Sequence, residues 1–456
     1  MLKAHPRGLY LLFATEMWER FSYYGNRALL TLFMLSALSF DKHFTAALYG
    51  QYTGLVFLTP LIGGYIADRF WGNRRSIMVG GILMAAGQFS LFAAGSVYQQ
   101  LNLAIPLFYL GLGLIILGNG LFKPNISTMV GQLYSAQDQR KDAAYTIFYM
   151  GINLGSFMAP LICGTLGDTG NPADFRWGFF AAGTGMLLSL LIFGLLQNRY
   201  LRDPEGHAIG MAPAQRSQTQ TANHQEPLTR ADYDRMLVIG VISFFVIFFW
   251  AAFEQAGVSL TFFANESLDR EIMGWTVPTS WFQSLNPVFV LLFAPLLAQL
   301  WVKLAKHDRE PASPTKMAYG LLLLAAGFLV IAQAVDQVGP GVKISLFWLV
   351  AMYWLHSMGE LCLSPIGLSL VNKLAPAKFA SLLMGVWFLS TAAANWFAGV
   401  LAGFYPEAGK AAPSFLGWQI HSLNDFFMLF VIMSFTAGAL LLLTTGQLQK
   451  RMHGVN

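Results

Sequence analysis

Seven ionisable side chains stand inside stretches of this sequence that are otherwise apolar. A charged group in the middle of a membrane-spanning helix costs roughly 2.5 to 3.5 kcal/mol on insertion scales, so such groups generally mark a binding site or an ion pathway. These residues could therefore bind a charged ligand or carry a proton. They are Glu16, Glu19, Arg20, Arg27, Lys123, Glu254 and Glu360.

The first four of these seven charges lie on one face of a predicted helix, together with Tyr23. Glu16, Glu19, Arg20, Tyr23 and Arg27 are spaced i, i+3, i+4, i+7 and i+11. At 100° per residue they fall within an arc of about 100°, which makes one continuous polar stripe. We expect this stripe to face a water-filled cavity rather than lipid. An ion-pair network that only fixes helix packing is the alternative.

The balance of these charges suggests proton coupling. Four carboxylates face three cations, and in a low-dielectric setting the surplus acid prefers its neutral form. The pattern does not say which glutamate carries the proton; we favour Glu254, with Glu19 second. The two cysteines, Cys163 and Cys362, lie in separate apolar runs without CxxC or Cys/His metal spacing. We therefore predict neither a metal nor another cofactor.

The composition indicates the elements that hold these residues. Of 456 residues, 55% are hydrophobic and 11% are charged, against roughly a quarter charged in soluble domains. A soluble enzyme is thereby excluded, and at about 20 residues per span a helical membrane protein with about a dozen spans is predicted. We expect spans near 10–38, 46–68, 76–97, 103–132, 143–166, 177–198, 236–264, 275–301, 317–335, 344–371, 379–404 and 424–447.

Basic residues favour cytoplasmic loops, which sets the orientation. With the N-terminus inside, twenty of the 28 basic residues fall in inner loops, five in outer loops and three in spans. Both termini are then cytoplasmic, and the +5 net charge needs no nucleic-acid partner. The first apolar run is broken by charges, so it is expected to be a retained helix. The predicted domains are a six-helix bundle (1–198), a cytoplasmic linker (199–235) and a second six-helix bundle (236–456).

The charges of the two predicted bundles can be paired by their depth along the predicted spans. Arg27 and Glu254 each lie in the outer half of an outward-running span, and Lys123 and Glu360 each lie in the inner half of an inward-running span. One pair near each face is what an alternating gate needs. We hypothesise an outer gate of Arg27 with Glu254 and an inner gate of Lys123 with Glu360.

Prolines and polar residues at mid-span suggest bending points near a binding site. Static kinks and helix-bridging amides are the alternatives that stay open. A packed, neutral His356 is favoured over a proton relay. The bending and ligand-binding candidates are Lys123-Pro124-Asn125, Asn286-Pro287, Ser364-Pro365, Tyr149 with Asn153, and Gln283 with Asn286, and the aromatic candidates for pocket walls are Tyr23, Tyr24, Tyr65 and Trp387.

Two motifs resemble known families. Residues 64–75, GYIADRFWGNRR, resemble the G-x-x-x-D-R-x-x-G-x-[RK]-[RK] loop of the major facilitator superfamily. Residues 16–25, EMWERFSYYG, are similar to the ExxERFxYYG signature of its proton-dependent oligopeptide transporters. The likeness continues at 122–125, 149–155, 249–255, 283–287 and 359–365.

This resemblance implies a role for each matching residue. Glu16, Glu19, Arg20 and Glu254 would couple protons, and Asp68 and Arg69 would latch the halves. Arg27, Lys123 and Glu360 would contact peptide termini or form gates. The pocket would be lined by Tyr23, Tyr24, Tyr65, Asn153 and Asn286. A zwitterion fits, because cations take its carboxylate and Glu360 takes its amine.

The sequence thus favours an all-α polytopic protein with the major facilitator fold, twelve transmembrane helices and a multi-pass location in the inner membrane. The expected function is proton-coupled import of di- and tripeptides by a monomer. Residues 199–235 are too short and polar to hold the two extra helices that bacterial members commonly carry. A carrier for nitrate or amino-acid conjugates is the alternative within this class; a channel or a membrane-embedded enzyme would be another class.

Overall fold

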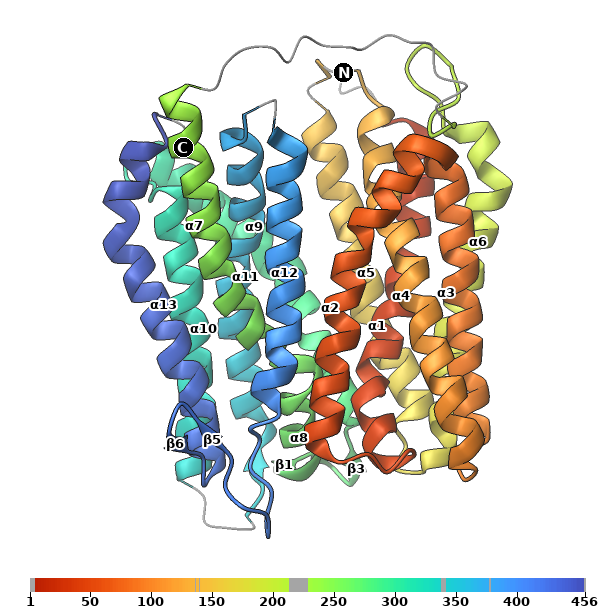
Figure 1. The fold of residues 1–456 in the computed structure, drawn as a ribbon, viewed down its shortest axis with the longest axis vertical. Coiled ribbons are helices and arrows are strands. Elements are labelled where there is room, and N and C mark those ends of the chain that lie inside the picture. Colours follow the sequence, from red (N-terminus) through yellow and green to blue (C-terminus); the bar gives the residue numbers. More distant parts are fainter. Residues whose placement is uncertain are drawn as a thin grey trace. The chain divides into compact units, whose positions relative to one another are not determined.

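The computed structural model describes residues 5–135, 137–138, 140–212, 229–337, 342–376 and 379–454. Twelve helices of 21 to 32 residues make up most of this part of the chain (Figure 1). They are α1 (Arg7–Ser36), α2 (Lys42–Ile66), α3 (Gly72–Ser96), α4 (Leu101–Gln132), α5 (Lys141–Gly167), α6 (Phe175–Tyr200), α7 (Arg230–Phe253), α9 (Leu285–Ala305), α10 (Ser313–Asp336), α11 (Leu346–Leu374), α12 (Ala380–Ala402) and α13 (Leu423–Arg451).

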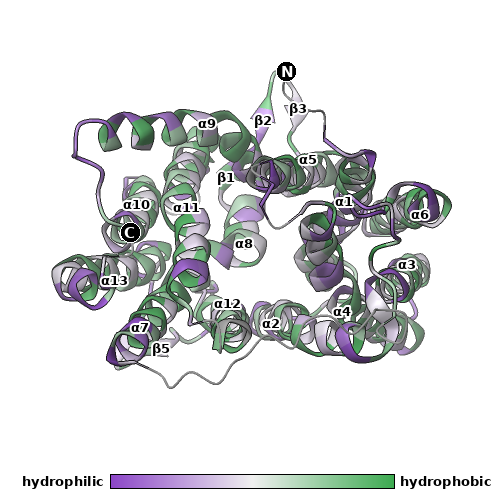
Figure 2. Cartoon of the chain, turned by 90° about the horizontal axis from the view of Figure 1, so that it is seen from above, coloured by the Kyte–Doolittle hydropathy of each residue, from purple (hydrophilic) through white to green (hydrophobic). Residues whose placement is uncertain are grey.

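Eleven of these helices are long and apolar enough to span a membrane. Among the described residues, ten stretches meet that requirement, and one of them, Lys42–Ser96, holds both α2 and α3. Helix α1 is not among the ten because its polar stripe lowers its hydropathy. Figure 2, which looks along the helices, shows hydrophobic residues predominating on them. The predicted all-α polytopic membrane fold is confirmed, and each predicted span contains most of one long helix, although the span 236–264 also includes η4 and α8.

Short elements connect the helices. They are the π-helix η1 (Ala67–Trp71), the 3₁₀ helices η2 (Pro172–Asp174), η4 (Glu254–Gly257) and η5 (Thr279–Ser284), and the short helix α8 (Ser259–Glu266). Strand β1 (Leu268–Asp269) pairs in parallel with β4 (Ile344–Ser345). Two antiparallel hairpins join β2 (Glu271–Ile272) to β3 (Trp275–Thr276) and β5 (Ser414–Phe415) to β6 (Trp418–Gln419).

The chain forms two compact units. Unit 1 holds residues 1–41, 55–220 and 278–284, and unit 2 holds 42–54, 221–277 and 285–456. Helix α2 therefore contributes its first half to unit 2 and its second half to unit 1. In unit 2, Gly50 lies against the backbone of Gly399 on α12; in unit 1, Gly63 lies against the carbonyl of Gly120 on α4. The predicted domain boundaries at 198 and 236 stay predictions.

The segment after α6 is held against unit 1, although the sequence analysis treats it as the start of a plain linker. Arg202 forms an isolated bridge with Ala208, and Ile209 is buried in the unit 1 core. The Arg74 guanidinium donates to the carbonyls of Leu201 (2.6 Å) and Ile209 (2.7 Å) and to the Asn198 side chain (3.0 Å). Only residues 213–228 of the predicted linker lie outside the described residues.

Candidate functional site

The charged residues of α1 form a buried cluster in unit 1. Glu16, Glu19 and Arg20 are exposed by only 1%, 0% and 2%. The Arg20 guanidinium donates to both carboxylate oxygens of Glu19, with Nη2 2.6 Å from Oε1. Its Nε also lies 3.3 Å from Glu16 Oε1. One guanidinium therefore serves two carboxylates.

A residue of α4 completes this cluster. Asn119 Nδ2 donates to Glu19 Oε1 at 3.4 Å. The second oxygen of Glu16, Oε2, is buried and has no hydrogen-bond partner among the residues that the structure describes. Buried carboxylate oxygens usually have such a partner, so this oxygen is an exception within the cluster.

Tyrosine rings cover the cationic part of the stripe. The Arg20 guanidinium lies 5.2 Å from the centroid of the Tyr23 ring, and that of Arg27 lies 5.8 Å from the Tyr24 ring. Arg27 is 8% exposed. Each of the two arginines thus stacks on a tyrosine ring of its own helix, and Arg20 is also covered by the two carboxylates. The predicted water-filled cavity beside the stripe stays a prediction.

The polar residues of α4 have two different roles. The Lys123 side chain is half-buried, with Nζ 4.3 Å from the centroid of the Phe57 ring on α2. Asn125 Nδ2 donates to the carbonyl of Leu121 (2.6 Å), and its Oδ1 accepts from Asn73 (2.9 Å). Pro124 lies inside the helix. The Asn125 side chain therefore bonds to a carbonyl of its own helix and connects α4 to α3. This arrangement agrees with a static kink at Pro124, the alternative to a bending point near a binding site.

The predicted pocket residues of α5 and α2 are less enclosed. Asn153 donates to the carbonyl of Tyr149 one turn earlier (3.0 Å), and the Tyr149 side chain is 41% exposed. Tyr65 is 56% exposed at the end of α2, where its ring contacts Phe70 and the Arg69 guanidinium. Asp68 and Arg69 lie in η1, the π-helical turn that connects α2 to α3, and both are exposed.

Unit 2 holds a second polar cluster, between α9 and α11. Asn286 Nδ2 donates to Glu360 Oε2 at 2.7 Å and to the Ser357 hydroxyl at 3.1 Å. The Ser357 hydroxyl in turn donates to the carbonyl of Tyr353 (2.8 Å). Asn286 is in the first turn of α9, immediately before Pro287. The cluster fixes one oxygen of Glu360.

Glu254 lies at a break in the predicted seventh span. Helix α7 ends at Phe253, and η4 and α8 follow, although the sequence predicts one continuous helix to about residue 264. The non-helical backbone of Val258 (φ −133°, ψ −84°) causes the break. Gln255 Nε2 stabilises it by donating to the carbonyls of Ala251 and Ala398, both at 3.0 Å. The buried Glu254 is therefore held at a helix end.

Two further predicted residues lie on α11 and α12. Trp387 is 6% exposed, and its ring fills the space beside Gly367, where an added Cβ would lie 2.3 Å from the indole. Ser364 is half-buried next to Pro365, inside α11. His356 is buried, and its ring lies 4.6 Å from the Phe328 ring centroid, in accordance with the favoured packed histidine.

The structure brings together part of the predicted set and adds two residues. Glu16, Glu19 and Arg20 meet in unit 1, and Asn286 and Glu360 meet in unit 2. The pairs Arg27–Glu254 and Lys123–Glu360 each take one residue from each unit and stay predictions. The sequence analysis missed Asn119 and Ser357; Asn119 stands four residues before Lys123, between two glycines of an apolar run, which is the signal that could have found it.

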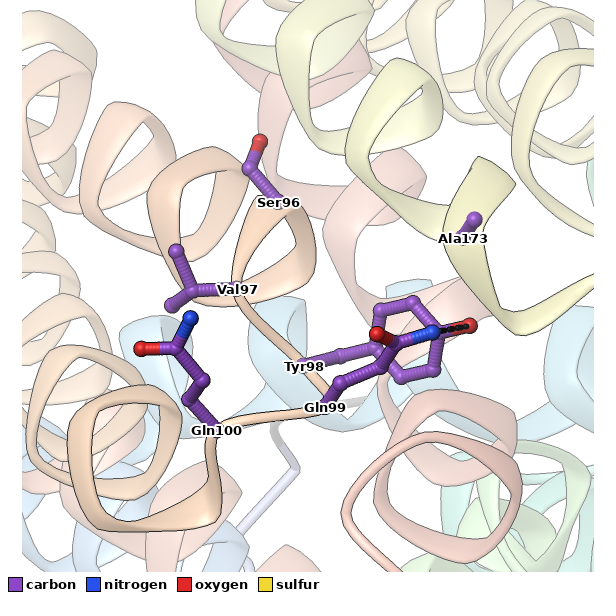
Figure 3. A pocket seen from close by; sticks show the side chains of 6 residues that line it. All are labelled: Ser96, Val97, Tyr98, Gln99, Gln100 and Ala173. Atoms are coloured by element: carbon purple, nitrogen blue, oxygen red, sulfur yellow. Dashed lines mark hydrogen bonds between the residues drawn. The ribbon is translucent and has the colours of Figure 1, made fainter.

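A small surface hollow lies apart from these clusters. It has a volume of about 220 Å³ and is lined by Ala173 and by residues 96–100, where Gln99 donates to the Tyr98 hydroxyl (Figure 3). None of its lining residues belongs to the predicted site. Within the described ranges, no group of three His, Cys, Asp or Glu side chains lies close enough to hold a metal ion. The predicted lack of a cofactor stays a prediction.

Comparison with known proteins identifies related sequences and structures. A model of the POT family matches residues 74–224 and 207–415. The uncharacterized transporter YclF of Bacillus subtilis (strain 168) is 36% identical, and the alignment covers 99% of this chain and 96% of YclF. The peptide transporter YePEPT of Yersinia enterocolitica is 37% identical, with 88% of each chain covered.

A solved structure shares the fold over the whole chain. It is the crystal structure of a mutant of the peptide transporter POT in complex with alafosfalin. The two chains are 32% identical and superimpose with a TM-score of 0.85, covering 100% of this chain and 97% of the other.

Proposed function

Since the chain belongs to the POT family, we propose that it is a proton-coupled symporter that imports di- and tripeptides by alternating access. It is a transporter rather than an enzyme, and a multi-pass protein of the cytoplasmic membrane. Peptide transporters among its relatives, and a related structure that holds alafosfalin, support a peptide as the substrate. We propose that it works as a monomer, without a cofactor.

The observation that carries this proposal is the contact between Asn286 and Glu360. The amide fixes one carboxylate oxygen, and the carboxylate offers its remaining lone pairs to a donor. An ammonium group is such a donor, and charge-assisted hydrogen bonds to carboxylates are the strong ones. We assign the amino terminus of the peptide to Glu360, and its carboxylate to the predicted cations Arg27 and Lys123. A nitrate carrier would have no use for an amine acceptor.

The cluster on α1 supplies the proton step in this proposal. Glu16 and Glu19 share Arg20, and we propose that the proton binds to one of these two carboxylates. A proton that enters the cell releases about 2.3 kcal/mol per 100 mV and about 1.4 kcal/mol per pH unit. The two terms together suffice for several-hundred-fold accumulation of a peptide. Glu254 remains the other candidate for the proton.

Uptake of labelled dialanine into proteoliposomes tests the proposal. With an inward pH gradient and a negative interior, we expect saturable accumulation that a protonophore abolishes. Unlabelled dialanine should compete, whereas N-acetyl-dialanine should not, because it lacks the amine that Glu360 receives.

A folded preparation that takes up no dialanine would refute peptide import and favour the alternative substrate classes. Equal competition by the acetylated peptide would refute the assignment of the amine to Glu360. Conductance that does not saturate would identify a channel instead.

A further inference from the structure

Two hairpins of unit 2 have the same design. The first covers residues 271–276 (EIMGWT), and the second covers residues 414–419 (SFLGWQ). In each, an apolar residue pairs with a tryptophan: Ile272 with Trp275, and Phe415 with Trp418. A two-residue turn of a bulky apolar residue followed by glycine connects the strands. Two hairpins that lie far apart in the sequence thus have the same kind of apolar turn, which we call the tip.

The turn residues are unfavourable for a loop in water. Both central residues of each turn have positive φ: 50° at Met273 and 81° at Gly274, 50° at Leu416 and 84° at Gly417. A turn of this kind prefers Asn-Gly or Asp-Gly, because left-handed backbone strains other side chains. Met273 is also 103% exposed and Leu416 is 92% exposed. Both tips thus combine backbone strain with full exposure of an apolar side chain.

The bases of the hairpins hold these tips in place. Val277 and Arg270 close the first hairpin: the Val277 amide donates to the Arg270 carbonyl, and the Arg270 guanidinium donates to the Val277 carbonyl, both at 2.9 Å. In the second, the Phe415 ring packs edge-on against Phe404, with centroids 5.3 Å apart. Both hairpins are therefore ordered at their bases while the side chains at their tips are exposed.

The first hairpin is connected to the start of α11 through a pair of short strands. Strand β1 precedes it and pairs with β4, where Leu268 lies opposite Ile344. Helix α11 follows β4 directly, and its second residue, Phe347, is 74% exposed. Lys343 stands just before β4. Basic residues and tryptophans next to exposed apolar side chains are typical of the membrane interface.

Both hairpins lie at the same end of unit 2 (Figure 1). In that view, the β5–β6 hairpin lies at the height of the last turns of α10 rather than beyond them. The predicted orientation makes this the outer end. The β5–β6 hairpin is thus at a depth where a bilayer that surrounds the helices has its headgroups.

We propose that Met273 and Leu416 insert into the boundary between headgroups and acyl chains of the outer leaflet, as two anchors of unit 2, with Trp275 and Trp418 at the level of the headgroups. Lipid removes the two apolar side chains from water, which compensates the strained turns. The partner is a lipid surface and not a protein, because each exposed apolar tip stands beside a tryptophan at the end of membrane-spanning helices, and the β5–β6 hairpin lies at the height of the last turns of α10. The proposal depends on the membrane fold and not on the transported substrate.

Quenching by nitroxide lipids tests the insertion. Single cysteines replace exposed strand residues beside each tip, Thr276→Cys and Gln419→Cys, and carry a fluorescent label; Cys163 and Cys362 are buried and stay unlabelled. The protein is placed in nanodiscs that contain phosphatidylcholine with a nitroxide on the fifth acyl carbon. We expect at least twofold stronger quenching at both positions than at Lys410→Cys, a control position in the same outer loop as the second hairpin.

Variants of the tips separate lipid contact from folding. Met273→Asn and Leu416→Asn suit the left-handed turn better than the native residues, so the hairpins should form, yet quenching should fall to the level of the Lys410→Cys control. Met273→Leu should keep the quenching. The proposal would be overturned if, with native tips, the labels at Thr276→Cys and Gln419→Cys were quenched no more than the label at Lys410→Cys and were fully accessible to aqueous iodide. The tips would then lie in water, where a protein partner could bind them. Quenching that survives both asparagines would overturn it too.

Discussion

At the residue scale, the hydrogen bond between Asn286 and Glu360 is the most informative contact. Asparagine beside a proline inside a membrane helix has two common explanations, a backbone contact at a kink or a ligand. The structure gives a third one, because the amide of Asn286 holds a carboxylate that lies 74 positions further along the chain. The amide thus acts on the substrate through the orientation of Glu360.

We expect Asn286→Ala to weaken peptide binding more than it weakens folding. The carboxylate loses a charge-assisted hydrogen bond worth about 1.5 to 3 kcal/mol, so the KM for dialanine should rise about tenfold or more. Uptake kinetics in proteoliposomes measure this change.

Asn395→Ala is the matched control for Asn286. It also removes a buried amide, but one that donates within its own helix, to the Thr391 carbonyl (2.9 Å). Its KM should stay at the native value. An equal rise in both variants would mean that Asn286 supports only packing.

A pH-dependent contribution to stability is expected at the loop between α4 and α5. The Arg140 side chain and backbone amide donate to Asp138, which lowers the pKa of this carboxyl to about 2. A carboxyl with a lower pKa in the folded state stabilises the fold above its unfolded pKa of about 3.9 and loses that effect as the pH falls towards 2.

Asp138→Asn should therefore lower the midpoint of thermal unfolding equally at pH 8 and pH 5, and by less at pH 3. Measurements in detergent at the three values check this. A difference between native protein and variant that grows as the pH falls would contradict the assignment.

At the element scale, the backbones of α2 and α4 touch at one glycine. A Cβ on Gly63 would lie 2.0 Å from the Gly120 carbonyl oxygen, whereas one on Gly64 would meet only Pro124 Cβ, at 3.8 Å. We expect Gly63→Ala to force the two helices apart and to cost about 1 to 3 kcal/mol, as overpacking typically does.

The neighbouring Gly64→Ala is the control. It should leave both the unfolding midpoint and the transport rate unchanged, because ordinary van der Waals contact is all that it adds. If both alanines behaved alike, the close approach of the helices at Gly63 would be in doubt.

The clamp that Arg74 forms on the segment after α6 leads to another prediction at this scale. The single ammonium nitrogen of lysine cannot reach the three acceptors that Nε, Nη1 and Nη2 of Arg74 contact, so Arg74→Lys should release residues 201–212 and destabilise unit 1 by about 2 kcal/mol. Faster limited proteolysis at this segment and a lower unfolding midpoint would report the loss.

Arg75→Lys provides the comparison for Arg74. Arg75 is the next residue, it is exposed, and its guanidinium lies over the Trp71 ring at 5.3 Å. Proteolysis should stay at the native rate in this variant. If residues 201–212 were cleaved at the native rate in Arg74→Lys, the burial of Ile209 would be enough to hold this segment.

At the scale of the whole molecule, the predicted gates are the main hypothesis. Each pair takes one residue from each unit, so we test the pairing by measuring transport. Reversing a single charge, as in Lys123→Glu or Glu360→Lys, should reduce uptake of dialanine at least tenfold, because like charges replace an attractive pair.

The double variant with Lys123→Glu and Glu360→Lys should regain part of the uptake, and the same cycle applies to Arg27 with Glu254. Counterflow of labelled peptide, which needs no proton gradient, distinguishes a gating defect from a coupling defect. Loss in the double variant that equals the product of the single losses would refute direct pairing.

The sequence by itself determined the class of the protein and the positions of its helices. Apolar stretches too long for a soluble fold leave one solution, because every backbone polar group in lipid must be paired within a helix. For the same reason, the residues that break the apolar pattern, such as Glu16 and Glu360, stand out as functional candidates by their position in the chain alone. The charge bias of the loops predicted the orientation in the same way.

Only the tertiary structure decided which side chains meet. Periodicity places a residue on a helix face but does not say which helix covers that face, so Asn119 beside Glu19 and Ser357 beside Asn286 could not be predicted. The break after Phe253 and the clamp of Arg74 on Leu201 were hidden for a related reason. Both depend on hydrogen bonds between residues far apart in sequence, Gln255 with Ala398 and Arg74 with Ile209, and no local pattern encodes such partners.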